Sequence, residues 1–435
     1  MLSFVNWITF LWLAYLALYS GRRIARGFRH SVDCLTLVHF IFCALPLFFD
    51  EVFGKPPYTH FIGFIHATSD LQTNLIYCAY ISVVPVLWLL FGVNKHIVPV
   101  TVPPLCQRDA LAIPSRQKNL IIVAHLFLFL PFALAFVSPE RGQYLLFSRT
   151  LRASLGDSGF HAQLSLACYV ACIAWATLIV NAKPHIYGKG PALSFWLFTV
   201  PFVFISIWLH GKRNIVALAA ILALLGLQHR GVLRGKRAYQ LGMITMLVVL
   251  GYSFFFQSYT GRVTRTLYEN MRVDYGRDDV IKMTIFAEMH PDEMQILEHR
   301  GQSFLFHLTT LVPRDFWPDK PLPYAQYLTS ALFYSAPRFW GWSMTTSILE
   351  EFIANTGWIG MLLAPIFLAI FCRIGDASGG SLLRILTPMI ACLLLAVQLT
   401  AYYPLMLLWG GLVLADKFRY SKNTTHIRHG RPIRP

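Results

Sequence analysis

Residues 119–138 read NLIIVAHLFLFLPFALAFVS and contain no Asp, Glu, Lys or Arg. A helix needs roughly 20 apolar residues to cross the hydrocarbon core of a bilayer, so this stretch predicts a membrane-spanning helix. Comparable windows recur along the chain, at about 2–20, 33–49, 72–93, 163–181, 193–210, 215–228, 239–257, 352–372, 384–400 and 404–416. The pattern predicts an all-α polytopic membrane protein with about 11 transmembrane helices, in a range of about 10 to 12.

The overall composition agrees with lipid as the main solvent. Of the 435 residues, 56% are hydrophobic and only 13% are charged, whereas soluble domains carry about 25% charged residues. The first apolar run lacks a basic leader and a small-residue cleavage site, so we expect it to remain as a helix. The cysteines lie mostly in apolar runs, and their spacing predicts neither a disulfide framework nor a metal site.

The basic residues indicate the orientation of the chain, because short cytoplasmic loops carry an excess of Lys and Arg. The segments GRRIARGFRH (21–30), HRGVLRGKRA (229–238) and KFRYSKNTTHIRHGRPIRP (417–435) all fall on one predicted side of the membrane. We therefore expect the C-terminus in the cytoplasm and the N-terminus outside. This topology, together with anionic lipid, accounts for the net charge of +16, so binding of nucleic acid is not expected.

The predicted topology divides the chain into four parts. A membrane domain with helices one to eight covers 1–257, and a large extracytoplasmic loop covers 258–351. Helices nine to eleven cover 352–416, and a basic cytoplasmic tail covers 417–435. The large loop is the gap between apolar windows that is wide enough for an independent fold.

Arginines on the outer side oppose the insertion bias and need another reason to be there. Arg141, Arg149 and Arg152 lie between two predicted helices, and Arg213 follows Lys212 in the tight turn HGKRN. A guanidinium presents a rigid fork of donors that matches phosphate oxygens, so these arginines are candidates for binding a lipid-linked phosphate or pyrophosphate. Anchoring to lipid headgroups, or salt bridges within the loops, is the alternative interpretation.

The stretch HRGQSFLFHLTTLVPRDFWPDKPLPYAQYLTSALF (299–333) is rich in proline between 313 and 323. Proline does not fit a helix interior, so we expect an ordered irregular loop that presents Arg314 and Lys320 between bulky apolar residues. Farther along the chain, Thr345 and Thr346 are the predicted N-caps of a helix with adjacent glutamates in its first turn.

Three motifs together resemble those of the O-antigen polymerase (Wzy) family. They are PR, two residues and WPDKP (313–321), then EF, two residues and NTGWIG (351–360), and the basic turn GKRNIVALAAILALLG (211–226). The resemblance implies a bacterial inner-membrane, GT-C-like glycosyltransferase that needs no metal and no cofactor. It would polymerise undecaprenyl-pyrophosphate-linked repeat units in the periplasm into O-antigen, capsule or exopolysaccharide.

The resemblance also implies partners and residue roles. The partners would be the lipid-linked glycan donor and acceptor, membrane lipid, a chain-length regulator and a flippase. Arg213, Arg314 and Lys320 would bind the pyrophosphate, together with the arginines at 141, 149 and 152 by the chemistry above. Some family members carry a glycine eleven residues after an arginine in the middle periplasmic loop, and none of these last three arginines meets that spacing.

A polymerase also needs a group that takes the proton of the acceptor hydroxyl. Glu351 is the first candidate for the general base, or for the residue that holds the base, and His307 is the second. Glu350 ranks lower, because adjacent residues on a helix point about 100° apart and both are not expected to face one substrate atom. The structural alternative for Glu351 is a helix cap or an ion pair with Arg314 or Lys320.

Aromatic and acidic residues outside the membrane are weaker signals. Trp317, Tyr324 and Trp340 are candidates for stacking on sugar rings, although interfacial aromatic belts use the same residue types. Asp50 and Glu51 resemble the acidic pair of metal-dependent GT-C enzymes, but alone at a helix end they do not predict a metal site.

Two rival functions remain open. An O-antigen ligase would use the same donor, although the ligase's late-loop histidine motif is not found in this sequence. A flippase or transporter for lipid-linked oligosaccharide would be expected to show paired repeats and charged residues deep within its helices.

Overall fold

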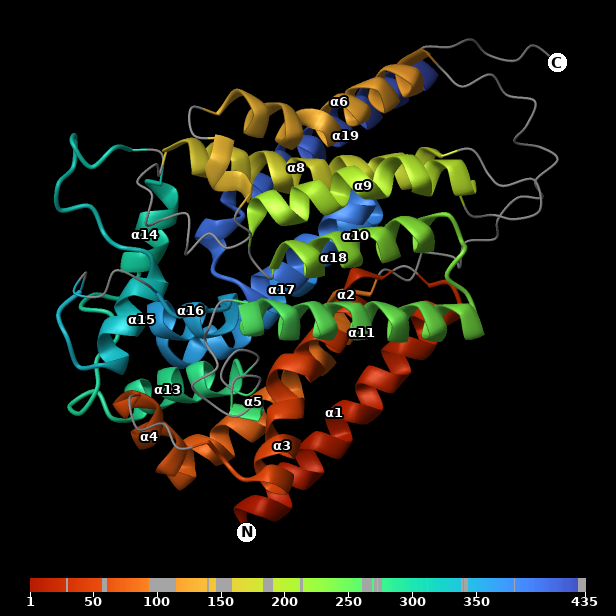
Figure 1. Cartoon of the computed structure of the whole chain (residues 1–435). Helices are drawn as coiled ribbons and strands as arrows, with labels where there is room; N and C mark the ends of the chain where they lie inside the picture. The colour runs from red at the N-terminus through yellow and green to blue at the C-terminus, as the bar shows by residue number, and fades with distance from the viewer. Residues whose placement is uncertain are drawn as a thin grey trace. The chain divides into compact units, whose positions relative to one another are not determined.

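The computed structural model describes residues 1–28, 30–56, 61–93, 115–138, 141–145, 159–182, 191–211, 214–259, 268–269, 272, 276–310, 312–337, 339, 343–378 and 380–428. This described part is built from helices and contains no strand (Figure 1). The predicted all-α class is therefore confirmed.

Eight of the described helical segments are long and apolar enough to cross a membrane, as expected of a multi-pass membrane protein. They are Leu2–Ala25, Ser31–Phe53, Leu71–Phe91, Asn119–Val137, Gln163–Asn181, Leu193–His210, Lys236–Phe256 and Ile348–Ala377. The remaining predicted windows also fall on helices, namely α10 (Asn214–His229), α18 (Ser381–Ala396) and α19 (Tyr403–Arg428). Their apolar parts are shorter, so the total of about 11 crossings and the GT-C-like fold stay predictions.

The described residues form two compact units. The second unit, Arg23–Arg29 with Val98–Thr266, contains α6 (Ser115–Val137), α8 (Gly159–Asn181), α9 (Leu193–His210), α10 and α11 (Lys236–Tyr259). Helix α8 packs against α6, α9 and α10, and buries the small residues Cys168, Ala171 and Cys172. Small side chains allow such close approach of helices in a membrane.

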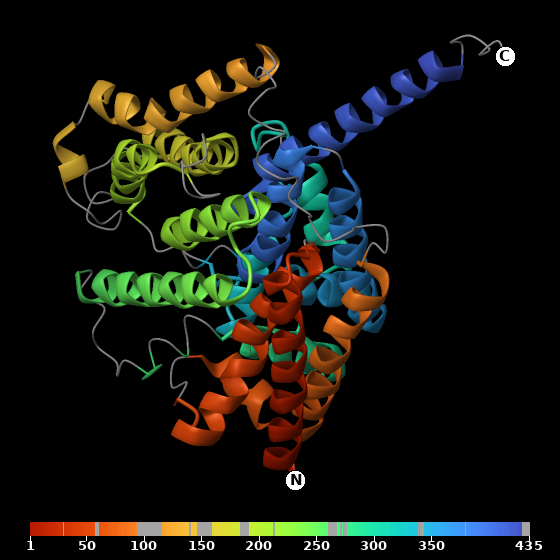
Figure 2. The same ribbon diagram turned by 90° about the vertical axis from the view of Figure 1, so that its right-hand side faces the viewer.

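The first unit comprises Met1–Arg22, His30–Ile97 and Leu267–Pro435. Its N-terminal helix α1 (Leu2–Ala25) lies against α3 (Leu45–Phe53) and α5 (Leu71–Phe91), as Figure 2 shows. The ring of Trp7 stands edge-on to Phe48 at 5.8 Å, and the Trp12 indole donates to the carbonyl of Ser82 at 3.2 Å.

A π-helical turn, η1 (Phe40–Ala44), joins α2 (Ser31–His39) to α3. Pro46 has no backbone N–H, so the carbonyl of Phe42 lacks its usual helical donor four residues on. The N–H of Arg277 donates to that carbonyl at 3.1 Å instead. The irregular turn therefore attaches the start of α13 to the membrane helices.

The long segment between α11 and α16 carries α13 (Asp278–Met289), α14 (Gln302–Leu308) and α15 (Tyr324–Leu332). Its described proline-rich part, 312–323, contains no helix, as predicted. The segment does not fold alone, because it shares one hydrophobic core with α4 (Ile62–Ser69) and with Ala354 of α16 (Ile348–Thr356). The main contributors to this core are Phe64, Ala67, Met283, Phe286, Leu328 and Leu332.

The entry into the last long span differs from the prediction. Ser347, and not Thr345 or Thr346, is the N-cap of α16, and the Glu350 carboxylate bonds back to Ser347 in a capping box. The sequence offered several hydroxyl residues in a row, and only the backbone conformation selects among them. Helix α16 ends at Gly357, where the short 3₁₀ turn η4 (Gly357–Ile359) leads into α17 (Gly360–Ala377).

Gly357 is required at this junction for two reasons. Its φ of +68° favours glycine. A Cβ at this position would also lie 2.2 Å from Nη1 of Arg300, whose guanidinium bonds to Glu288 at 2.8 Å.

Candidate functional site

The side chains of Glu351 and His307 meet in the first unit, where α14 packs against α16. His307 Nε2 lies 2.7 Å from Glu351 Oε1, and Ser303 Oγ donates to the same oxygen at 2.8 Å. Asn355 Nδ2 donates to Ser303 Oγ at 2.7 Å and to the backbone carbonyl of Glu351 at 2.6 Å. We refer to Ser303, His307, Glu351 and Asn355 as the α14–α16 cluster; all of them are buried.

Helical spacing explains how this cluster forms. Ser303 and His307 are four residues apart and therefore share one face of α14, and Glu351 and Asn355 share one face of α16 in the same way. Glu350 points about 100° away from Glu351, and its carboxylate is used by the cap at Ser347. The structural role imagined for Glu351 as a cap thus belongs to Glu350, and the ion-pair partner of Glu351 is His307 rather than Arg314 or Lys320.

The pairing determines which nitrogen of His307 can act. A carboxylate oxygen accepts hydrogen bonds, so a neutral His307 carries its proton on Nε2 and its lone pair on Nδ1. Nδ1 is buried and has no hydrogen-bond partner among the described residues. An imidazole held by a carboxylate, with its other nitrogen open, is suited to accept a proton from a bound hydroxyl.

The two cations of the proline-rich loop bond to the loop itself. Arg314 donates to the carbonyls of Lys320 at 2.7 Å and Pro321 at 2.9 Å. Lys320 is buried, and its Nζ donates to the carbonyls of Thr310 at 3.2 Å and Val312 at 2.9 Å. These bonds replace the backbone partners that prolines cannot supply, so both cations stabilise the loop.

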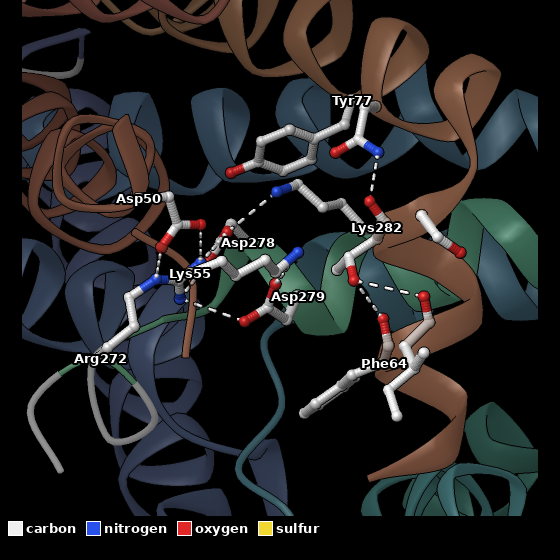
Figure 3. Close-up of polar contacts among 12 residues, drawn as sticks. Asp50, Lys55, Phe64, Tyr77, Arg272, Asp278, Asp279 and Lys282 are labelled. Atoms are coloured by element: carbon white, nitrogen blue, oxygen red, sulfur yellow. Dashed lines mark hydrogen bonds and ion pairs between the residues drawn. The ribbon is translucent and has the colours of Figure 1, made fainter. Parts of the chain in front are cut away.

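A second charged group, centred on Arg272, lies where the first outer segment meets α13 (Figure 3). The Arg272 side chain is fully buried and bonds to Asp50 at 2.7 and 2.8 Å, to Asp278 at 2.9 and 2.7 Å, and to Asp279 at 3.1 Å. The guanidinium lies so close to the backbone of Gly276 that a Cβ there would come within 2.1 Å of Nη1. We refer to Arg272 with these three aspartates as the Arg272 cluster.

Two lysines balance the remaining negative charge of the Arg272 cluster. Lys282 Nζ lies 3.1 Å from Asp278 Oδ2 and 4.9 Å from the centre of the Tyr77 ring, and Lys55 Nζ lies 3.9 Å from Asp279 Oδ1 (Figure 3). Burial acts to raise the pKa of Asp278, but Arg272 and Lys282 outweigh it and lower that pKa to about 2. Burial lowers the pKa of Lys55 to about 8. The group thus holds three cations and three carboxylates, and its charges compensate one another.

The other predicted site residues divide by position. Tyr324 is 2% exposed and donates or accepts at Thr284, so its ring has no face open to a sugar, whereas Trp317 is partly exposed. Arg141 is exposed in the second unit, 4.8 Å over the ring of Phe136. Arg149, Arg152, Arg213 and Trp340 lie outside the described residues.

Sequence reasoning missed Ser303 and the Arg272 cluster. Ser303 precedes His307 by four residues, and that spacing was the available signal for a shared helix face. Asp50 was considered as half of a metal pair, but it bonds to Arg272, and Glu51 accepts from Ser3 and Asn6. In the described part of the chain, no three His, Cys, Asp or Glu side chains are grouped so that they could hold a metal ion.

Comparison of this chain with protein-family models, with curated proteins and with solved structures finds no match. The class of protein that the fold defines is therefore a multi-pass α-helical membrane protein. Its activity rests on the site geometry and on the motifs described above.

Proposed function

We propose that this chain is a periplasmic glycosyltransferase that polymerises oligosaccharide repeat units carried on undecaprenyl pyrophosphate. The observation that carries the proposal is the 2.7 Å contact of His307 Nε2 with Glu351 Oε1, which leaves Nδ1 as a buried proton acceptor. The motifs that resemble the O-antigen polymerase family supply the substrate class, and Glu351 begins one of them.

The proposed reaction forms one glycosidic bond. A hydroxyl oxygen of the acceptor sugar attacks the anomeric carbon of the donor glycan, and the hydroxyl proton passes to His307 Nδ1. The bond from that carbon to the pyrophosphate oxygen breaks, and undecaprenyl pyrophosphate leaves with the electron pair. Glu351 stabilises the imidazolium that forms, because its carboxylate accepts the Nε2–H hydrogen bond.

The donor pyrophosphate is assigned to the cations that match the family motifs, Arg213, Arg314 and Lys320. A guanidinium has five N–H donors, and Arg314 directs two of them to the loop carbonyls of Lys320 and Pro321. In the proposal, the other donors bind phosphate oxygens and oppose the charge that develops on the leaving group. Arg314 then both stabilises the loop and binds the donor.

The test uses purified protein and lipid-linked repeat units isolated from a strain that lacks this chain. We expect His307→Ala and Glu351→Gln each to reduce turnover by about 10² to 10⁴, with donor binding retained. Added imidazole should restore part of the activity of His307→Ala, because the small base can enter the space left by the ring. A purely structural histidine would not show this rescue.

A matched control is His299→Ala, which removes an exposed histidine from the same segment. We expect its turnover to stay near that of the parent protein. Near-normal turnover of His307→Ala, at equal expression and thermal stability, would refute the proposed base.

The glycan ladder of the deletion strain separates the rival activities. A polymerase defect leaves single repeat units attached to the carrier glycolipid and removes the longer chains. Loss of all attached glycan would instead point to a ligase or to a flippase.

A further inference from the structure

The hydrogen bonds of the α14–α16 cluster run in one direction only. The backbone carbonyl of Glu351 is solely an acceptor, so the Asn355 atom 2.6 Å from it must be the NH₂ group. The same NH₂ group donates to Ser303 Oγ, which in turn donates to Glu351 Oε1. The orientation of the Asn355 amide is therefore determined, and its Oδ1 is directed away from these partners.

The cluster ends in two acceptors. One is His307 Nδ1 and the other is Asn355 Oδ1, and neither has a hydrogen-bond partner among the described residues. The side chains are well buried, with Asn355 3% and His307 9% exposed. Each buried acceptor without a partner costs about 1–3 kcal/mol, and folded proteins retain few of them.

The chemistry of the cluster limits what could complete it. Both open atoms accept hydrogen bonds, and both belong to a network that converges on the Glu351 carboxylate. A phosphate or carboxylate brings acceptors and negative charge, so it would be repelled here. A sugar brings several O–H donors without charge, and it would satisfy both atoms.

We propose that His307 Nδ1 and Asn355 Oδ1 together bind two hydroxyl groups of the acceptor sugar. The reacting hydroxyl donates to His307, and a second hydroxyl of the same sugar donates to Asn355. This inference rests on the proposed function, and it makes Asn355 an acceptor-binding residue. It also separates the acceptor subsite from the donor pyrophosphate, which binds to cations.

The experiment measures the KM of each substrate separately. Repeat-unit oligosaccharide freed from its lipid by mild acid has lost its pyrophosphate, so it can serve only as acceptor. Transfer to this soluble oligosaccharide from the lipid-linked repeat unit is followed for the parent protein and for Asn355→Ala. We expect Asn355→Ala to raise the KM of the soluble acceptor about tenfold, since one hydrogen bond of about 1.4 kcal/mol is lost. The KM of the lipid-linked donor should change less than about twofold.

Thr356→Val is the matched control. It removes another side-chain hydrogen bond of α16, from Thr356 Oγ1 to the carbonyl of Phe352 at 2.8 Å, and should leave both KM values unchanged. If Asn355→Ala does not accumulate, Asn355→Ser is measured in the same way, because its hydroxyl can keep one internal bond.

The outcomes separate this inference from the proposed function. An unchanged acceptor KM in the Asn355 variant, or a rise in the donor KM alone, overturns the acceptor subsite while the polymerase proposal stands. No transfer by the parent protein overturns the proposed function, and the acceptor subsite with it.

Discussion

Removing the guanidinium of Arg272 is the most severe single perturbation that we expect for this fold. The Arg272 side chain is fully buried and bonds to Asp50, Asp278 and Asp279 at 2.7–3.1 Å. Arg272→Met keeps most of the apolar stem but leaves three carboxylates with only Lys282 and Lys55 nearby.

The expected loss follows from the cost of an uncompensated buried charge. Removing one partner of a buried ion pair costs about 3–5 kcal/mol, and Arg272 serves three carboxylates, so we expect a value at the upper end. Arg272→Lys keeps the charge but not the fork of donors, so we expect it to recover only part of this stability. Adding Asp278→Asn to Arg272→Met should also recover part, because one carboxylate loses its charge.

The assay is thermal unfolding of the detergent-solubilised protein, with Arg300→Met as the control. Arg300 forms an ion pair with Glu288 at 2.8 Å, but its side chain is 61% exposed. Exposed pairs contribute about 0–1 kcal/mol, so the control should shift the unfolding midpoint much less. Equal shifts for Arg272→Met and Arg300→Met would refute the conclusion that the Arg272 cluster stabilises the fold.

Two further predictions concern acid stability and topology. The pKa of Asp278 is about 2 in the folded protein against 3.8 for the free side chain, so the unfolded chain takes up the proton first as the pH falls. The contribution of Asp278 is complete above pH 3.8 and is lost as the pH falls to about 2; unfolding midpoints across this range should therefore drop less in Asp278→Asn than in the parent. For topology, a cysteine replacing Glu298 in a cysteine-free background should react with an impermeant thiol reagent in intact cells, and one replacing Lys236 should not. Labelling at Lys236 would reverse the predicted orientation.

The membrane helices were accessible to sequence reasoning because their signal is local. An apolar window such as 119–138 predicts a helix from its own residues, and the structure has a helix at each predicted window. The cap at Ser347 was missed, because neighbouring hydroxyl residues have similar cap propensities and the backbone decides between them.

The candidate site was only partly accessible. Glu351 and His307 were named separately, by residue type and motif, but their contact spans 44 residues of sequence. Arg272 was not singled out at all, since its bonds to Asp50 span 222 residues. Pairings at such separations leave no periodic pattern, so they could not be predicted from one sequence.

The sequence by itself determined the helical membrane architecture, because burial in lipid depends on the length and polarity of each continuous segment. The tertiary structure alone decided that α4 joins the core of the long segment and that α14 brings His307 to Glu351. It also decided that Asp50 bonds to a guanidinium. These choices depend on which side chains pack together across distant parts of the chain, and packing complementarity is a property of the folded molecule rather than of any local stretch of sequence.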